Sequence, residues 1–136
     1  MATKKFLDWV LDESESSHLI DKICSSYEDH QDSLEWKIFL GTYHGIKIYA
    51  VERSHLEIEN PEWRFYLGSH HWGKTTDYIP EDEIWVSKNL DEKTFRRILN
   101  HELVEREAMR ALEEEKGMTP QEAWTMAHMW VKQMGF

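Results

Sequence analysis

The spacing of apolar residues changes along the chain and separates helical parts from extended ones. In residues 1–33 the apolar side chains recur three or four positions apart, as in amphipathic helices, at Phe6, Trp9, Val10, Leu19, Ile20, Ile23, Cys24 and Tyr27. A polar stretch, Glu13 to Ser17, lies between the two groups. We therefore predict one or two N-terminal helices whose apolar sides contribute to packing.

Residues 34–88 carry short runs of aromatic and β-branched side chains, which are typical of strands. The runs predict four strands, at Glu35–Leu40, Ile46–Val51, Trp63–Leu67 and Ile84–Val86. Gly41 and Gly45 bound the first pair, which indicates a hairpin, and Asn60-Pro61 precedes the third strand. This segment is predicted to form a small antiparallel or mixed sheet.

Residues 89–136 are predicted to form two amphipathic helices. Asn89 or Asp91 can cap the first, which should end near Gly117, a residue suited to the left-handed conformation after a helix. The second should start at Thr119-Pro120-Gln121-Glu122, a capping box with proline in the first turn. Its inward face is expected to carry Trp124, Ala127, Val131 and Met134, with His128 on the flank.

Together these elements predict a single α+β domain over residues 1–136. With 136 residues, of which 40% are hydrophobic, the chain can build one core but not two independent ones. Its single cysteine, Cys24, excludes an internal disulfide and a zinc cluster built on several cysteines.

Charge restricts the partners of this domain. The chain has 26 acidic and 16 basic side chains, a net charge of −10, which repels nucleic-acid phosphates and anionic lipids. No apolar run approaches the roughly 20 residues that span a bilayer, and the start MATKKFLDW lacks a signal-peptide core. We expect a cytoplasmic protein that binds neither nucleic acid nor membrane.

The segment Asn100–Glu105 places ionisable groups on the apolar side of a predicted helix. At about 100° per residue, His101, Glu102 and Glu105 share one arc with the apolar residues of that helix. Burying an unpaired carboxylate is costly, so these groups must be protonated, paired with a cation or bound to a metal ion, and the last option fits best. The same phase places Phe95, Ile98, Ala108, Met109 and Leu112 on this side, and Arg96, Glu107 and Glu114 on the opposite side.

A metal site follows from this placement. His101 and Glu105 lie four positions apart and project side by side, so each can give one ligand to the same ion. His128 on the last helix is the expected third ligand, with His70 or His71 as the alternative. Two histidines and a glutamate leave one position open, the pattern of a catalytic zinc site, although another divalent metal could also bind. Glu102 could then act as general base and pass the proton to a leaving amine.

In this motif the chain resembles the zincin metallopeptidases, and in particular small prokaryotic and phage-type proteins in which a HELVE helix precedes an Ala-His helix. The resemblance covers about 55 C-terminal residues. It implies that His101 is a ligand, that Glu102 is the general base, that a peptide or protein is the substrate, and that an edge strand, here Ile84–Ser87, lies beside that substrate. The chain has Glu105 where the common motif has a second histidine, and His128 where the gluzincin branch has a glutamate.

A non-catalytic alternative stays open. Arg97, Arg106 or Arg110 could neutralise the two inward glutamates, and His101 could bond a backbone carbonyl. The metal, or the ionic network alone, would then brace a two-helix module that binds another protein through its aromatic surface.

The segment Gly68–Thr75 matches the phosphate-binding loop pattern, but its context disagrees. That motif opens a helix, whereas Pro80 would break a helix here within about two turns. Nucleotide binding is therefore the less favoured prediction. A loop at the rim of the proposed cleft accounts equally well for His70, His71 and Trp72, and Trp85 is a further candidate for the cleft.

Overall fold

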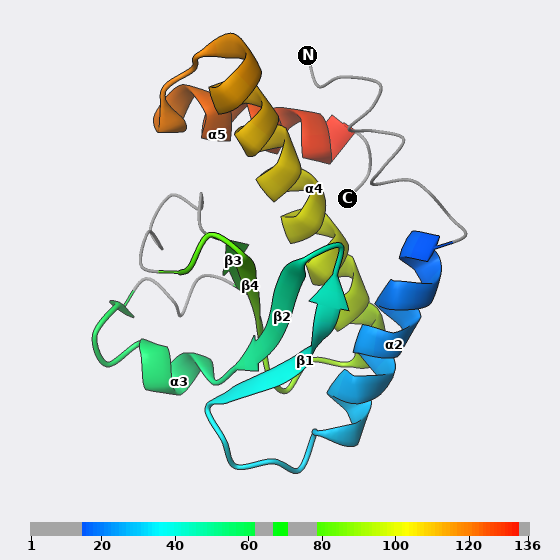
Figure 1. Cartoon of the computed structure of the whole chain (residues 1–136). Coiled ribbons are helices and arrows are strands. Elements are labelled where there is room, and N and C mark those ends of the chain that lie inside the picture. Colours follow the sequence, from blue (N-terminus) through cyan, green and yellow to red (C-terminus); the bar gives the residue numbers. More distant parts are fainter. Residues whose placement is uncertain (1–14, 62–66, 71–78, 134–136) are drawn as a thin grey trace.

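The computed structural model describes residues 15–61, 67–70 and 79–133, which form an α+β protein (Figure 1). Its elements, in chain order, are α2 (Glu15–Asp29), β1 (Lys37–Tyr43), β2 (Ile46–Val51), α3 (Arg53–Leu56), β3 (Gly68–His70), β4 (Glu83–Ser87), α4 (Glu92–Lys116) and α5 (Pro120–Gln133). None of the helices in this described part is both long enough and apolar enough to cross a membrane. Phe6, Trp9 and Val10 of the predicted N-terminal helical region lie outside the described residues, and α2 begins within the polar stretch that was expected to separate two helices.

The four strands form one mixed sheet in the order β1-β2-β4-β3. The predicted hairpin is confirmed: β1 and β2 are antiparallel, and His44 and Gly45 take positive φ angles of 47° and 85° in the turn between them. β2 pairs parallel with β4, and β4 pairs antiparallel with β3. The prediction of a small antiparallel or mixed sheet is therefore correct in its mixed form.

One strand prediction needs correction, and another lies largely outside the described residues. Ile84–Ser87 was expected at the edge of the sheet, but β4 lies between β2 and β3, so that β3 is the outermost described strand on this side. The third strand was expected at Trp63–Leu67, of which residues 63–66 lie outside the described residues, and β3 begins at Gly68. Glycine, serine and histidine are weak strand formers, so the pairing with β4 rather than local preference makes this strand.

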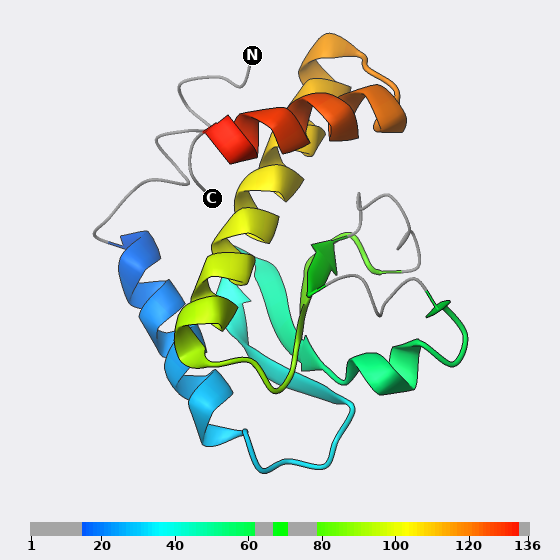
Figure 2. The ribbon, with the colours of Figure 1, turned by 180° about the vertical axis from the view of Figure 1, so that it is seen from behind.

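Helices α2 and α4 pack side by side on one face of the sheet (Figure 2). Side chains along each strand point alternately to the two faces of the sheet, so every second residue points toward these helices. Tyr27 of α2 stacks on Phe95 of α4 with ring centroids 3.8 Å apart. The buried core on this face contains Ile20, Ile23, Cys24, Tyr27, Ile38, Leu40, Ile48, Ala50, Ile84, Val86, Phe95, Leu99 and Leu103.

Local signals set the limits of α4 and α5 as predicted. The side chain of Asp91 accepts a hydrogen bond from the Thr94 amide at 2.9 Å, so that Asp91 rather than Asn89 is the N-cap of α4. Gly117 ends the helix in the left-handed conformation with φ 65°. Thr119 and Glu122 exchange the two bonds of a capping box, at 3.0 and 3.2 Å. As a result α5 turns back across the C-terminal half of α4 (Figures 1 and 2).

The α4–α5 contact has a core of its own. Ala127 and Val131 are buried as expected, Trp124 is partly buried, and Met134 lies outside the described residues. Small side chains on α5 let the two helices approach closely, which matters for the site described next. The buried residues are Val104, Ala108, Met109, Leu112, Ala123, Ala127 and Val131.

Candidate metal centre

The inward phase of the ionisable residues on α4 is confirmed for its glutamates. Glu102 and Glu105 are buried, with 8% and 5% of their surface exposed, and His101 is half-buried. One part of the prediction is wrong: Glu107, expected on the solvent side, is 4% exposed. Arg106 lies beside Glu107 and forms an ion pair with it, and this pairing offsets part of the cost of burying the carboxylate.

The structure brings His101, Glu105 and His128 together. Glu105 Oε2 lies 3.2 Å from His101 Nε2 and 3.0 Å from His128 Nδ1. One possible ligand atom from each of the three residues lies within 4.8 Å of the other two. The two imidazole rings are 5.8 Å apart and meet at 75°, so their nitrogens converge on the carboxylate from different directions.

Helix geometry explains this convergence. His101 and Glu105 are one turn apart on α4 and therefore share a face. The turn at Gly117 and the cap at Thr119 bring α5 back over α4, and Ala127, fully buried between the helices, places its neighbour His128 at the boundary of the contact. The three residues thus come together through two helices and one tight turn.

The indole ring of Trp124 packs against the His128 ring. The two residues are one turn apart on α5, and their rings stack with centroids 4.8 Å apart and an interplanar angle of 11°. Sequence analysis placed Trp124 in the inward stripe but gave it no role in the site. The sequence did contain a signal for this contact, because Trp124 precedes His128 by four positions, about one helical turn.

Glu102 has a different environment from Glu105. Burial and, to a smaller extent, repulsion from Glu105 raise the pKa of Glu102 to about 8, while His101 acts in the opposite direction. In the absence of a metal ion this carboxyl group thus holds its proton near neutral pH. Since Glu105 and His101 both influence this carboxyl group electrostatically, it lies near the three-residue cluster.

Gly68 of β3 packs directly against this part of α4. A Cβ atom on Gly68 would lie 2.9 Å from Ile98 Cγ2, 3.3 Å from Glu102 Cγ and 3.3 Å from the Trp85 carbonyl oxygen. Only glycine allows so close an approach of strand and helix. Sequence analysis considered Gly68 only as part of a phosphate-binding pattern, whereas an isolated glycine next to a strand pattern also marks a close backbone contact.

Of the other predicted site residues, the structure describes the backbone of His70 and the whole of Trp85. His70 ends β3 opposite Ile84, and His71 and Trp72 lie outside the described residues. Trp85 points to the sheet face opposite α4, since its neighbours Ile84 and Val86 face that helix. Residues Gly68 to His70 form a strand antiparallel to β4, not a loop after a parallel strand, which further disfavours a phosphate-binding loop.

Of the three arginines considered as partners for the inward glutamates, Arg106 and Arg110 pair with Glu107. Arg110 Nη2 lies 2.6 Å from Glu107 Oε2, and Arg106 pairs with the same carboxylate. Arg106 also donates a hydrogen bond of 2.7 Å to the carbonyl oxygen of Glu81. These contacts form an ionic network on α4 that begins directly after Glu105 in the sequence.

The donor set fits a small divalent cation. Zinc binds imidazole nitrogen and carboxylate oxygen at about 2.0–2.2 Å, and tetrahedral geometry then separates two ligands by about 3.3 Å. The two separations from Glu105, 3.2 and 3.0 Å, are close to this value, and all three ligand atoms lie within 4.8 Å of one another, so small side-chain movements would admit the ion. Ligands from two helices packed on a common core are also well fixed in position.

Fold and site together define the chain as an α+β protein with a two-histidine, one-glutamate cluster on a helical hairpin. No family model, curated protein or solved structure matches the chain. The chemistry that follows therefore rests on the residues themselves.

Proposed function

We propose that this protein binds one divalent metal ion, preferably Zn²⁺, through His101, Glu105 and His128, and hydrolyses peptide or amide bonds with Glu102 as general base. One observation supports the proposal: three metal-binding groups from two helices lie within 4.8 Å of one another, near enough for small side-chain movements to bring them to one ion. The zincin-like character of the α4–α5 unit is part of the same proposal.

Each residue of the cluster has its own role in the proposed hydrolysis. His101, Glu105 and His128 supply three ligands and leave room for a fourth. A zinc ion held there would act as a Lewis acid and lower the pKa of water to about 7. Glu102 would accept the proton of the attacking water and deliver it to the leaving amine. A cation beside Glu102 would lower the pKa of its carboxyl group, which burial raises, and so bring that pKa closer to neutral pH.

Strand β3 offers a place for an extended substrate. It is the outermost described strand on its side of the sheet, and Gly68 holds it against α4 beside Glu102. An extended peptide can bind to a sheet by lying alongside its outermost strand. We therefore propose that Gly68–His70, and not Ile84–Ser87, is the strand that lies beside the substrate.

A second candidate is a non-catalytic brace. The two hydrogen bonds from His101 and His128 to Glu105 already connect the cluster without a metal, and they join α4 to α5. In that case the cluster stabilises the helical hairpin, and the protein serves as a binding module.

Metal analysis and a hydrolysis assay distinguish the two. Tag-free protein supplemented with zinc should retain about one ion per chain, and His101→Ala should lose it, whereas His18→Ala, at an exposed position on α2, should not. Glu102→Gln should keep the metal and lose peptide hydrolysis. Wild-type protein that holds zinc but cleaves nothing in a broad peptide library would favour the brace. A metal content far below one ion per chain would overturn the metal-dependent proposal and leave the brace without a metal.

A further inference from the structure

The sheet face opposite α2 and α4 carries a second group of aromatic side chains. Phe39, Tyr49 and Trp85 lie in register on three adjacent strands, and their alternation directs them away from the helices. Phe39 is 52% exposed, and it meets Tyr49 edge-on with centroids 5.5 Å apart. This face is thus distinct from the candidate metal centre on α4.

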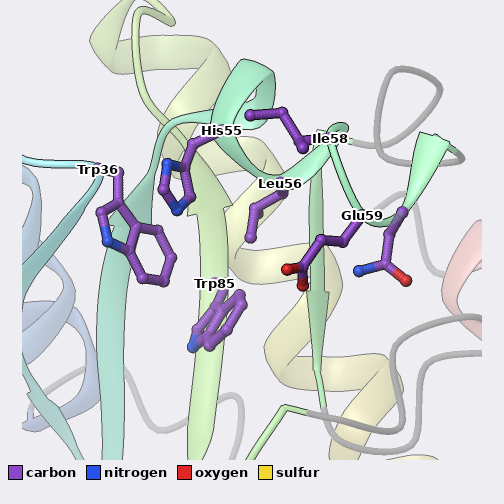
Figure 3. Close-up of a pocket in the computed structure, with 7 residues that line it drawn as sticks. Trp36, His55, Leu56, Ile58, Glu59 and Trp85 are labelled. Carbon is purple, nitrogen blue, oxygen red and sulfur yellow. The ribbon is translucent and has the colours of Figure 1, made fainter.

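A pocket of about 480 Å³ opens at the α3 end of this face. This volume lies in the range of small-ligand sites. Figure 3 shows Trp36 and His55 on one side of the pocket, Glu59 on the other, and Leu56 and Trp85 between them. The described residues that line it are Trp36, His55, Leu56, Ile58, Glu59, Asn60 and Trp85.

Two indole rings at a steep angle form the aromatic part of the pocket. Trp36 and Trp85 meet at 76° with centroids 6.1 Å apart. His55 stacks on Trp36 at 4.5 Å and 13° and so fixes the orientation of that ring. Trp36 is 37% exposed and Trp85 5%, so a guest would meet mainly the indole of Trp36, and aromatic rings favour cations and flat groups.

Polar groups complement these rings. Within the described residues, the carboxylate of Glu59 makes no hydrogen bond or ion pair, and the same holds for the side-chain amide of Asn60 and the indole N–H of Trp36. A guest can therefore bond to them without breaking contacts inside the protein. The carboxylate gives the pocket a preference for positive charge.

The protein already binds one of its own cations to the same aromatic group. The ammonium nitrogen of Lys37 lies 4.8 Å from the centre of the Trp85 ring and 4.4 Å from that of Tyr49. Glu83 neutralises this charge, with its carboxylate oxygen 3.1 Å from Lys37 Nζ. Trp85 thus acts as a cation–π acceptor in the folded protein, and the net charge of −10 draws further cations to the surface.

We propose that this pocket binds an arginine side chain of a partner peptide or protein. The planar guanidinium group can stack on indole, pair with the Glu59 carboxylate through two donors and give a further hydrogen bond to the Asn60 carbonyl. The ammonium group of lysine cannot stack or bind in a bidentate manner. The site does not depend on a metal ion in α4.

Calorimetric titration with blocked pentapeptides tests the proposal. The peptides have the form Gly-Gly-X-Gly-Gly, in which X is arginine, lysine, citrulline or phenylalanine. Citrulline has the shape of arginine without its charge. The arginine peptide should bind about tenfold more tightly than the citrulline peptide, and more tightly than the lysine peptide. Equal affinity for arginine and citrulline, or tightest binding of phenylalanine, would overturn the proposal. Free arginine that binds as tightly as the peptide would show a small-molecule site instead.

Variants locate the binding. Trp36→Ala and Glu59→Gln should each weaken the arginine peptide about tenfold, and both positions are partly or fully exposed, so the fold should tolerate the changes. Glu115→Gln removes the same charge at an exposed position at the end of α4 and should leave binding unchanged. His101→Ala should also leave it unchanged, which separates this site from the metal centre. Full binding by both pocket variants would refute the assignment.

Discussion

Glu105 of α4 lies 3.0 Å from His128 of α5, although 23 positions separate the two residues in the chain. The contact places a half-buried imidazole and a buried carboxylate at the boundary of the α4–α5 core. His101 reaches the same carboxylate oxygen from one turn earlier. A single oxygen atom therefore joins both histidines, and any ion bound there would connect the two helices.

Zinc is expected to stabilise the wild-type protein but not Glu105→Ala. A ligand that binds only the folded state adds about 2.7 kcal/mol to the free energy of unfolding at one hundred times its dissociation constant. Loss of the central ligand should remove this response, while Glu102→Gln should preserve it. Thermal unfolding with zinc and with a chelator measures the effect. An equal response of wild type and Glu105→Ala would place the ion elsewhere.

Trp124→Ala is expected to weaken zinc binding about tenfold, because side chains that orient a ligand typically contribute that much to metal affinity. The stacked indole restricts the His128 ring to the orientation that points Nδ1 at Glu105. Trp124→Phe keeps a stacking ring and should restore most of the affinity. Competition with a coloured zinc chelator gives the constants. If alanine and phenylalanine variants bind alike, stacking does not position the histidine.

Gly68→Ala is expected to destabilise the protein by about 1–3 kcal/mol, the usual cost of overpacking. The added methyl group would press on Ile98 and on the side chain of Glu102. Removing the nearest atom with Ile98→Ala should relieve part of the strain, so the double variant should lose less stability than the sum of the two single ones. Urea unfolding of wild type, the two single variants and the double variant gives the four free energies of this double-mutant cycle. Strict additivity would mean that strand and helix do not touch here.

The helical part of the structure could be predicted because its signals are local. Asp91, Gly117 and the Thr119–Glu122 pair define the helix limits through bonds between residues a few positions apart. The inward phase of Glu102 and Glu105 follows from helix periodicity alone. Once both helices were located, the meeting of His128 with α4 required only a tight turn at Gly117.

The parts that could not be predicted depend on distant partners. Gly68–His70 becomes a strand only because β4 is beside it, and β4 becomes an inner strand for the same reason. Glu107 is buried because Arg106 and Arg110 accompany it, and periodicity assigns such a charge to the surface. The pocket beside α3 joins residues from β4, from α3 and its flanks, and no single stretch of sequence contains its pattern.

Cys24 is expected to be unreactive in the folded protein at mildly alkaline pH. Burial between α2 and the sheet raises the pKa of its thiol from the ordinary 9.0 to about 12, so the reactive thiolate is scarce. A thiol reagent that gives a coloured product should label it only after unfolding in urea, which serves as the positive control. Rapid labelling of the native protein would contradict the burial of this residue.

The same shift makes stability depend on pH in a defined direction. Between pH 9 and about 12 the unfolded chain ionises Cys24 while the folded chain does not, so the free energy of unfolding should fall as pH rises through this window. Tyr27, whose pKa is also raised by burial, adds to the fall. Cys24→Ala removes the thiol contribution and should show a shallower decline than wild type in urea unfolding across this range. Parallel pH profiles for the two proteins would mean that the thiol titrates alike in both states.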